Sequence, residues 1–74
     1  MKWEPFPDGT FQATLGAGKA TVQSVSRFSQ PVTWLVYVRW KDQSRIQTDM
    51  PSQQAAQEWA EAMLRHFQDQ DQEA

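Results

Sequence analysis

The side chains that commonly carry out catalysis are few in this chain and form no catalytic constellation. His66 is the only histidine, and a serine or threonine nucleophile of the triad type needs an imidazole as its general base. This histidine lies in the last part of a helix-forming, acidic segment, where a surface imidazolium offsets the helix dipole. We therefore interpret His66 as a surface residue and predict that the protein is not an enzyme.

Neither the acidic nor the glycine-rich segments match a metal or phosphate motif. Glu58 and Glu61 are three residues apart on the polar side of a predicted helix, which is typical of a solvated surface. One histidine and scattered carboxylates offer no metal-ligand spacing. Gly16-Ala17-Gly18-Lys19 lacks the glycine spacing and the following helix of a P-loop, so it predicts a hairpin turn. We expect no cofactor, no metal and no small-molecule substrate.

Length and composition favour one small folded domain. The chain has 74 residues, of which 39% are hydrophobic and 22% charged, with four Trp, four Phe and one Tyr. Such a chain is too aromatic to stay disordered and too short for two cores. It has no Cys, so packing alone must stabilise it. Because no segment resembles a signal peptide or reaches the about 20 apolar residues that span a bilayer, we expect a cytoplasmic protein without membrane contact.

Charge is distributed unevenly along the chain. The net charge is -2, yet residues up to Ile46 are net basic and those from Gln47 onward are net acidic. Residues 69–74 contain no large apolar side chain, so we predict one domain over residues 1–68 and a disordered acidic tail over 69–74. An acidic surface that imitates DNA phosphates is an alternative interpretation of this end.

Alternating apolar and polar residues predict strands in the first two thirds of the chain. Pro7-Asp8-Gly9 has the residue types of a tight turn, and Thr10 to Leu15 then alternates as a strand with one wet face. Lys19 to Phe28 continues as a second strand after the Gly16-Ala17-Gly18 turn. Arg45 to Thr48 is a short polar strand, typical of a sheet edge, and Ile46 is its one predicted inward anchor.

The most apolar strand runs from Trp34 to Trp40 and is predicted to be central. One of its faces carries large apolar side chains only, namely Trp34, Val36, Val38 and Trp40. Its other face carries Leu35, Tyr37 and Arg39.

After Pro51 the periodicity becomes that of a helix, with Ser52 as its predicted N-cap. Apolar residues recur at helical spacing and form one stripe: Ala55, Ala56, Trp59, Ala60, Met63 and Phe67. The predicted fold class is therefore α+β, an antiparallel meander of three or four strands with one C-terminal helix packed on one face.

A single helix leaves the other face of the sheet without cover. The candidate interaction surface consists of Gln23, Val25, Arg27, Leu35, Tyr37 and Arg39. A protein partner, or a face-to-face or edge-to-edge homodimer, would bury these residues. Folding of Trp3, Phe6 and Phe28 over the same face is the alternative within one copy. The predicted function is that of a small non-catalytic binding or accessory protein.

The order of elements and two short motifs resemble the arm-type DNA-binding domain of phage integrases. Gly9-Thr10-Phe11 is similar to that family's glycine-aromatic strand start, and Ser52 to Ala56 followed by Trp59 is similar to its helix opening. The resemblance covers most of the chain and implies DNA binding through the sheet. The family's sheet is dense in Lys and Arg, whereas this chain has uncharged residues at positions 21, 23, 35 and 37. The composition is similar to that of small proteins of bacterial genomes and prophages.

Overall fold

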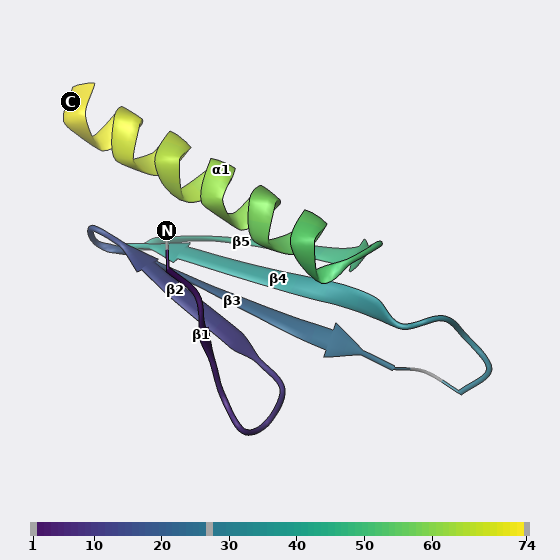
Figure 1. The fold of residues 1–74 in the computed structure, drawn as a ribbon. Coiled ribbons are helices and arrows are strands. Elements are labelled where there is room, and N and C mark those ends of the chain that lie inside the picture. Colours follow the sequence, from purple (N-terminus) through teal and green to yellow (C-terminus); the bar gives the residue numbers. More distant parts are fainter. Residues whose placement is uncertain (1, 27, 74) are drawn as a thin grey trace.

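The computed structural model describes residues 2–26 and 28–73 of the chain. Five antiparallel strands follow one another across a single sheet, and one helix succeeds them. The elements are β1 (Glu4–Pro5), β2 (Phe11–Leu15), β3 (Gly18–Val25), β4 (Thr33–Trp40), β5 (Gln43–Met50) and α1 (Gln53–Glu73). Figure 1 shows α1 lying across one side of the sheet. The α+β class and the single covering helix are confirmed, and the sheet has five strands instead of three or four.

The additional strand, β1, is joined to β2 by the predicted tight turn. Gly9 adopts a φ of 89° and donates its N–H to the Phe6 carbonyl at 3.0 Å. The Asp8 carboxylate accepts hydrogen bonds from the Thr10 hydroxyl at 2.7 Å and the Thr10 N–H at 3.1 Å. These two bonds, the hydroxyl first, hold the pKa of Asp8 below its ordinary value. The turn thus fixes β1 against β2 by local hydrogen bonds.

The core lies between α1 and the β3–β4 pair. Its buried members are Ala20, Val22, Val36, Val38, Trp40, Ala56, Ala60, Leu64 and Phe67. Because the helix presents alanines to the sheet, its backbone approaches closely, and the rings of Trp40 and Phe67 stack with centroids 6.3 Å apart. Leu64 is fully buried although it was absent from the predicted stripe, whereas Trp59 and Met63 are only partly buried.

Gly18 marks the closest approach between the sheet and the helix. A Cβ atom at this position would overlap the Trp40 ring and the Leu64 side chain. Glycine is therefore required here by space, because a close contact of this kind leaves no room for a side chain.

Both ends of α1 are held by specific polar contacts. The Ala55 N–H donates to the Ser52 hydroxyl at 3.1 Å, as predicted for the N-cap. Near the other end, the Lys41 ammonium in the β4–β5 turn donates to the Asp71 carboxylate at 2.8 Å. The helix runs to Glu73, through the residues for which the sequence predicts a disordered tail, and the ion pair links Asp71 to the β4–β5 turn.

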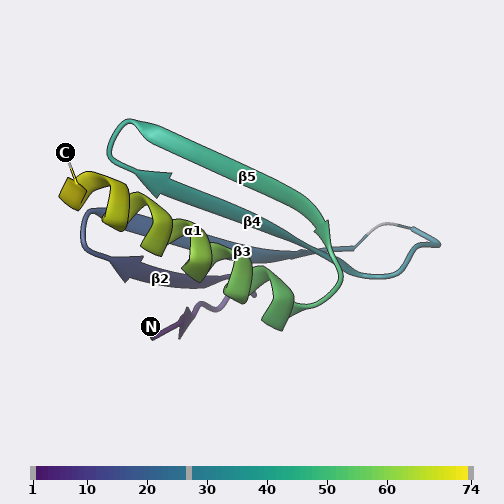
Figure 2. The ribbon, with the colours of Figure 1, turned by 90° about the horizontal axis from the view of Figure 1, so that it is seen from above.

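β5 is longer than predicted, and Ile46 does not point inward. The two-residue turn after Trp40 pairs that residue with Gln43, and the same register pairs Tyr37 with Ile46. This register places Ile46 on the side away from α1, where 60% of its surface is exposed. Viewed from above, α1 covers β3 and β4 and leaves β5 beside it (Figure 2). Because neither face of β5 is buried, its polar side chains keep their contact with water.

Candidate interaction surface

We call the side of the sheet away from α1 the open face. It is formed by the strand residues that alternate with those of the core. Most of the predicted interaction surface lies on it, namely Gln23, Val25, Leu35, Tyr37 and Arg39. Arg27, the sixth member, lies outside the described residues. Ile46 of β5 also lies on the open face. The even number of residues in the turn after Trp40 indicates this face, because the turn length sets the register between β4 and β5.

The middle of the open face is apolar. We call Val25, Leu35, Tyr37 and Ile46 the apolar centre. Tyr37 lies between Thr21 of β3 and Ile46 of β5, and 39% of its surface is exposed. Val25 and Leu35 are partly buried by neighbours within the sheet. Aromatic and β-branched side chains pack well across neighbouring strands, and Tyr37 and Ile46 are direct cross-strand partners.

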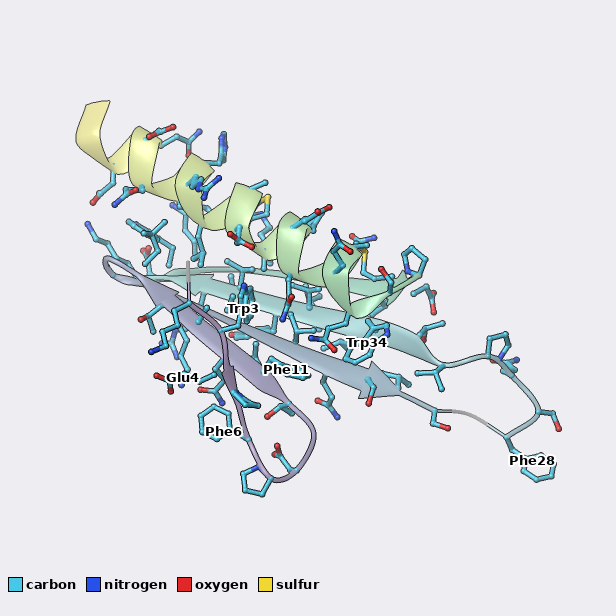
Figure 3. The ribbon with its side chains drawn as sticks, viewed as in Figure 1. Trp3, Glu4, Phe6, Phe11, Phe28 and Trp34 are labelled. Carbon is cyan, nitrogen blue, oxygen red and sulfur yellow. The ribbon has the colours of Figure 1, made fainter. Side chains whose placement is uncertain are left out.

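Two of the aromatic residues that could fold over this centre, Trp3 and Phe28, lie elsewhere. The Trp3 indole nitrogen donates to the Glu61 carboxylate at 3.4 Å, so Trp3 lies on the helix side (Figure 3). Phe28 is 99% exposed at the far loop, and Phe6 points away from α1 beside β1. Trp3 and Phe28 therefore do not provide the cover within one copy, whereas Phe6 lies beside β1 on the side of the open face with 39% of its surface exposed.

A row of hydrogen-bond donors crosses one end of the open face, and we call it the basic row. It consists of Thr14, Lys19, Arg39 and Ser44, each the register partner of the next. Lys19 and Arg39 face each other directly, and like charges in that position destabilise a sheet. No described carboxylate forms an ion pair with either one. Lys19 and Arg39 are therefore not ion-paired within the described residues, although Glu4 lines the same hollow as Lys19.

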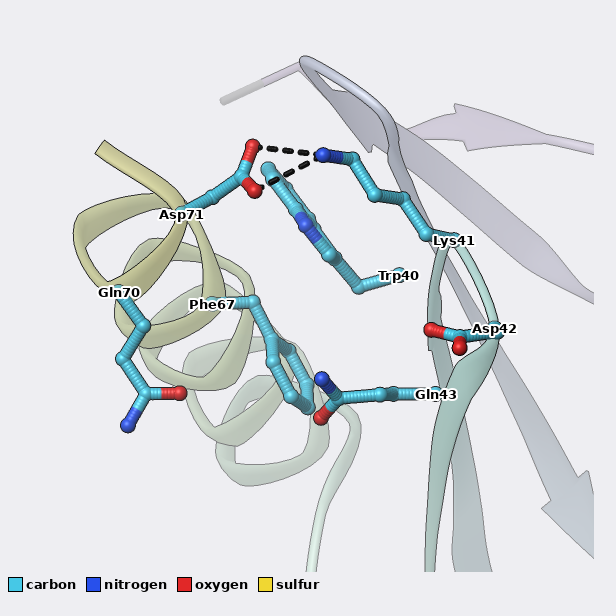
Figure 4. A pocket seen from close by; sticks show the side chains of 7 residues that line it. All are labelled: Trp40, Lys41, Asp42, Gln43, Phe67, Gln70 and Asp71. Atoms are coloured by element: carbon cyan, nitrogen blue, oxygen red, sulfur yellow. Dashed lines mark hydrogen bonds and ion pairs between the residues drawn. The ribbon is translucent and has the colours of Figure 1, made fainter. Parts of the chain in front are cut away.

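A hollow lies elsewhere, between the β4–β5 turn and the end of α1 (Figure 4). Its volume is about 300 Å³. Trp40 and Phe67 form the floor of this hollow, but both side chains are nearly fully buried. At its rim, Lys41 and Asp71 form an ion pair and so neutralise each other's charge. The hollow therefore offers little apolar surface and no pair of groups suited to acid–base chemistry.

The residues first considered for chemistry are dispersed over the helix. His66 is exposed, and Glu61 lies 3.8 Å from Arg65 while Glu58 accepts from Gln54. Among residues 2–26 and 28–73, no three potential metal ligands gather.

Within the same part of the chain, no helix is both long and apolar enough to cross a membrane. No family model, curated protein or solved structure matches the chain.

Proposed function

We propose that this protein is a small non-catalytic binding or accessory protein that associates with a second copy of itself through the open face. The supporting observation is the apolar centre, in which Tyr37 and Ile46 are 39% and 60% exposed on a face without cover. Removing such surface from water is favourable by about 25 cal/mol per Å². A domain with a small core gains most from that burial.

The size of the open face suits a dimer. A stable interface buries about 800 Å² on each partner, which is about one sixth of the 5150 Å² surface of this molecule. One face of a sheet in a molecule of 47 × 21 × 20 Å can supply that area. Two open faces in contact would give four layers, with a helix outside each sheet and both apolar centres inside.

Charge favours one orientation of the two copies. Lys19 and Arg39 lie toward one end of their strands, beside the β2–β3 and β4–β5 turns. A two-fold axis that runs across the strands brings the apolar centres together and places the two Lys19–Arg39 pairs at opposite ends of the interface. An axis along the strands would bring the four cations together, which costs free energy.

The test uses Tyr37, because it is the only tyrosine of the chain. We expect nitration of its ring by tetranitromethane to slow as protein concentration rises from low to high micromolar, in step with a rise in mass by analytical ultracentrifugation. Tyr37→Lys should lower the mass at high concentration, whereas Gln54→Lys, the same change on the helix, should not. A nitration rate independent of concentration would exclude this interface.

Sheet-mediated DNA binding, which the resemblance to arm-type integrase domains implies, is the second candidate. The observation in its favour is the basic row, because two exposed cations without an ion-pair partner among the described residues suit a phosphate backbone. The double variant Lys19→Gln with Arg39→Gln should then weaken binding to mixed-sequence duplex at low salt. Electrostatic affinity is greatest under those conditions, so an unmodified chain that fails to bind there eliminates this function.

A further inference from the structure

The turn between β1 and β2 contains the only Asp-Gly dipeptide of the chain, Asp8-Gly9. In such a dipeptide the backbone nitrogen of glycine can attack the side-chain carboxyl carbon of aspartate, because glycine has no side chain that shields its nitrogen. The attack closes a succinimide ring. It is intramolecular, so the two groups are already held close together and need no enzyme. Asp8 and Gly9 are therefore a pair of residues that can react with each other.

The fold leaves room for this ring. The β1–β2 turn lies away from α1 (Figure 1), and both Asp8 and Gly9 are exposed. A Cβ atom added to Gly9 would have no other atom within 4 Å. The surrounding structure therefore presents no steric barrier to a ring at this position.

Hydrogen bonds hold both reacting groups in a less reactive state. The Gly9 N–H donates to the Phe6 carbonyl at 3.0 Å, so its nitrogen is engaged in the turn. The Asp8 carboxylate accepts from the Thr10 hydroxyl at 2.7 Å and from the Thr10 N–H at 3.1 Å. These two bonds lower the pKa of Asp8, and an ionised carboxylate resists attack because its oxygen must leave as water. Thr10 therefore slows the reaction.

The reaction has two steps, and both balance without a cofactor. In the first step a bond forms between the Gly9 nitrogen and the Asp8 carboxyl carbon, a carbon–oxygen bond of that carboxyl breaks, and one water leaves with the Gly9 proton. In the second step one water opens the ring. When this water attacks the main-chain carbonyl carbon of Asp8, Gly9 remains joined to the side-chain carbon, which is isoaspartate. Attack at the other carbonyl restores aspartate.

Isoaspartate lengthens the main chain of the turn by one carbon. The turn is closed by the Gly9–Phe6 bond and by the Phe6 N–H, which donates to the Thr10 carbonyl at 2.9 Å. A three-residue hairpin loop with glycine at positive φ has a defined geometry, which an additional backbone carbon breaks. Because β1 consists of two exposed residues, little else holds it, and weakly held elements open locally.

We propose that Asp8-Gly9 is a site of spontaneous covalent modification to isoaspartate, that Thr10 sets its rate, and that the product releases β1 from β2. The modification reports the age of the molecule, because neither a ligand nor an enzyme starts it. It does not rest on the function proposed above, since β1 and its turn contain no residue of the apolar centre.

Incubation of the full chain at mildly acidic pH, followed by peptide mapping, measures the modification. Electron-transfer fragmentation distinguishes isoaspartate from aspartate, which has the same mass. We expect isoaspartate to accumulate faster at Asp8 than at the aspartates that precede Gln or Met, which are internal controls: Asp42, Asp49, Asp69 and Asp71. No accumulation at Asp8, or equal accumulation at all of these positions, would overturn the proposal.

A substitution at Thr10 tests the control of the rate. Thr10→Val removes the hydroxyl donor, and the loss of a hydrogen bond to a charged group should make isoaspartate form about tenfold faster. Thr10→Ser keeps a hydroxyl and should keep the rate of the unmodified chain. In concentrated urea, where the turn is unfolded, all three chains should react at the same rate. An unchanged rate in folded Thr10→Val, or the same difference in urea, would contradict the assigned role of Thr10.

Hydrogen exchange followed by NMR tests the release of β1. A partly converted sample contains both forms of the chain, and their amides are measured side by side. We expect the Phe6 amide to exchange about tenfold faster in the isoaspartate form, because its bond to Thr10 is lost. The Tyr37 amide, in the central strand β4, should exchange at the same rate in both forms. Equal protection of the Phe6 amide in both forms would show that β1 remains paired, contrary to the proposal.

Discussion

The two faces of the sheet are built from alternate residues of the same strands, yet only one contributes to a core. On the α1 side Val36 and Val38 are fully buried, whereas Tyr37 between them is 39% exposed on the open face. The backbone pairing is common to both faces, so the difference arises from the side chains and from the helix. Stability is therefore concentrated on the covered face, and the open face carries surface that contact with another molecule would bury.

The largest expected effect comes from a cavity on the covered face. Leu64→Ala should lower the free energy of unfolding by about 2–5 kcal/mol, because Leu64 is fully buried and its neighbours cannot close the space. Ile46→Ala on the open face is the comparison, with an expected change within about 0.5 kcal/mol. Urea denaturation measures both changes in unfolding free energy, at a protein concentration where both variants are monomeric. Similar losses would show that the faces do not differ in stability.

Overpacking tests the same face in the opposite direction. Gly18→Ala should destabilise the protein by about 1–3 kcal/mol, because the added methyl group overlaps Trp40 and Leu64. The double variant Gly18→Ala with Leu64→Ala should lose less than the sum of the two single losses, since the cavity admits the methyl group. Thermal denaturation followed by circular dichroism provides the values. Additive losses would indicate that Gly18 and Leu64 are not coupled.

On the open face a charge change should stabilise the protein. Lys19→Glu replaces the opposed cations with an attractive pair across β3 and β4, and we expect a gain of about 0.2–1 kcal/mol in unfolding free energy at low salt. Lys19→Gln, which only removes the repulsion, should gain less. Both gains should shrink as salt rises. A loss of stability in Lys19→Glu would mean that Lys19 has a favourable partner on this face.

The smallest expected effect concerns the β1–β2 turn, which lies on neither face. The pKa of the Asp8 carboxyl is below its ordinary value of 3.8 because Thr10 donates two hydrogen bonds to it. The resulting stabilisation is present above that ordinary pKa and is lost as pH falls through the lower folded value. Thr10→Val should therefore raise the pKa of Asp8, as measured by NMR titration. An unchanged pKa would show that the hydroxyl does not bond to Asp8 in solution.

Local patterns in the sequence sufficed for much of the fold. The alternation in Trp34 to Trp40 predicts both faces of β4, and Ser52 predicts the start of α1, because periodicity and capping depend on neighbouring residues only. Five of the six candidate surface residues lie on the open face for the same reason.

The misplaced features depend on long-range contacts or on turn geometry. Ile46 lies on the open face because its register partner is Tyr37, whereas the sequence indicated the covered face only because Ile46 is the one large apolar residue of the predicted strand. The contact between Lys41 and Asp71 joins residues 30 positions apart in the chain, so no local pattern could indicate it. β1 is two residues long and contains a proline, so no strand pattern can indicate it.

The order of the strands also has a consequence for synthesis on the ribosome. Each strand pairs with the one made just before it, so the meander can grow as the chain emerges, with little loop closure to overcome. The helix is translated after every strand. Until it emerges, Val22, Val36 and Val38 have nothing to pack against, and the nascent sheet is apolar on the side where a chaperone would bind.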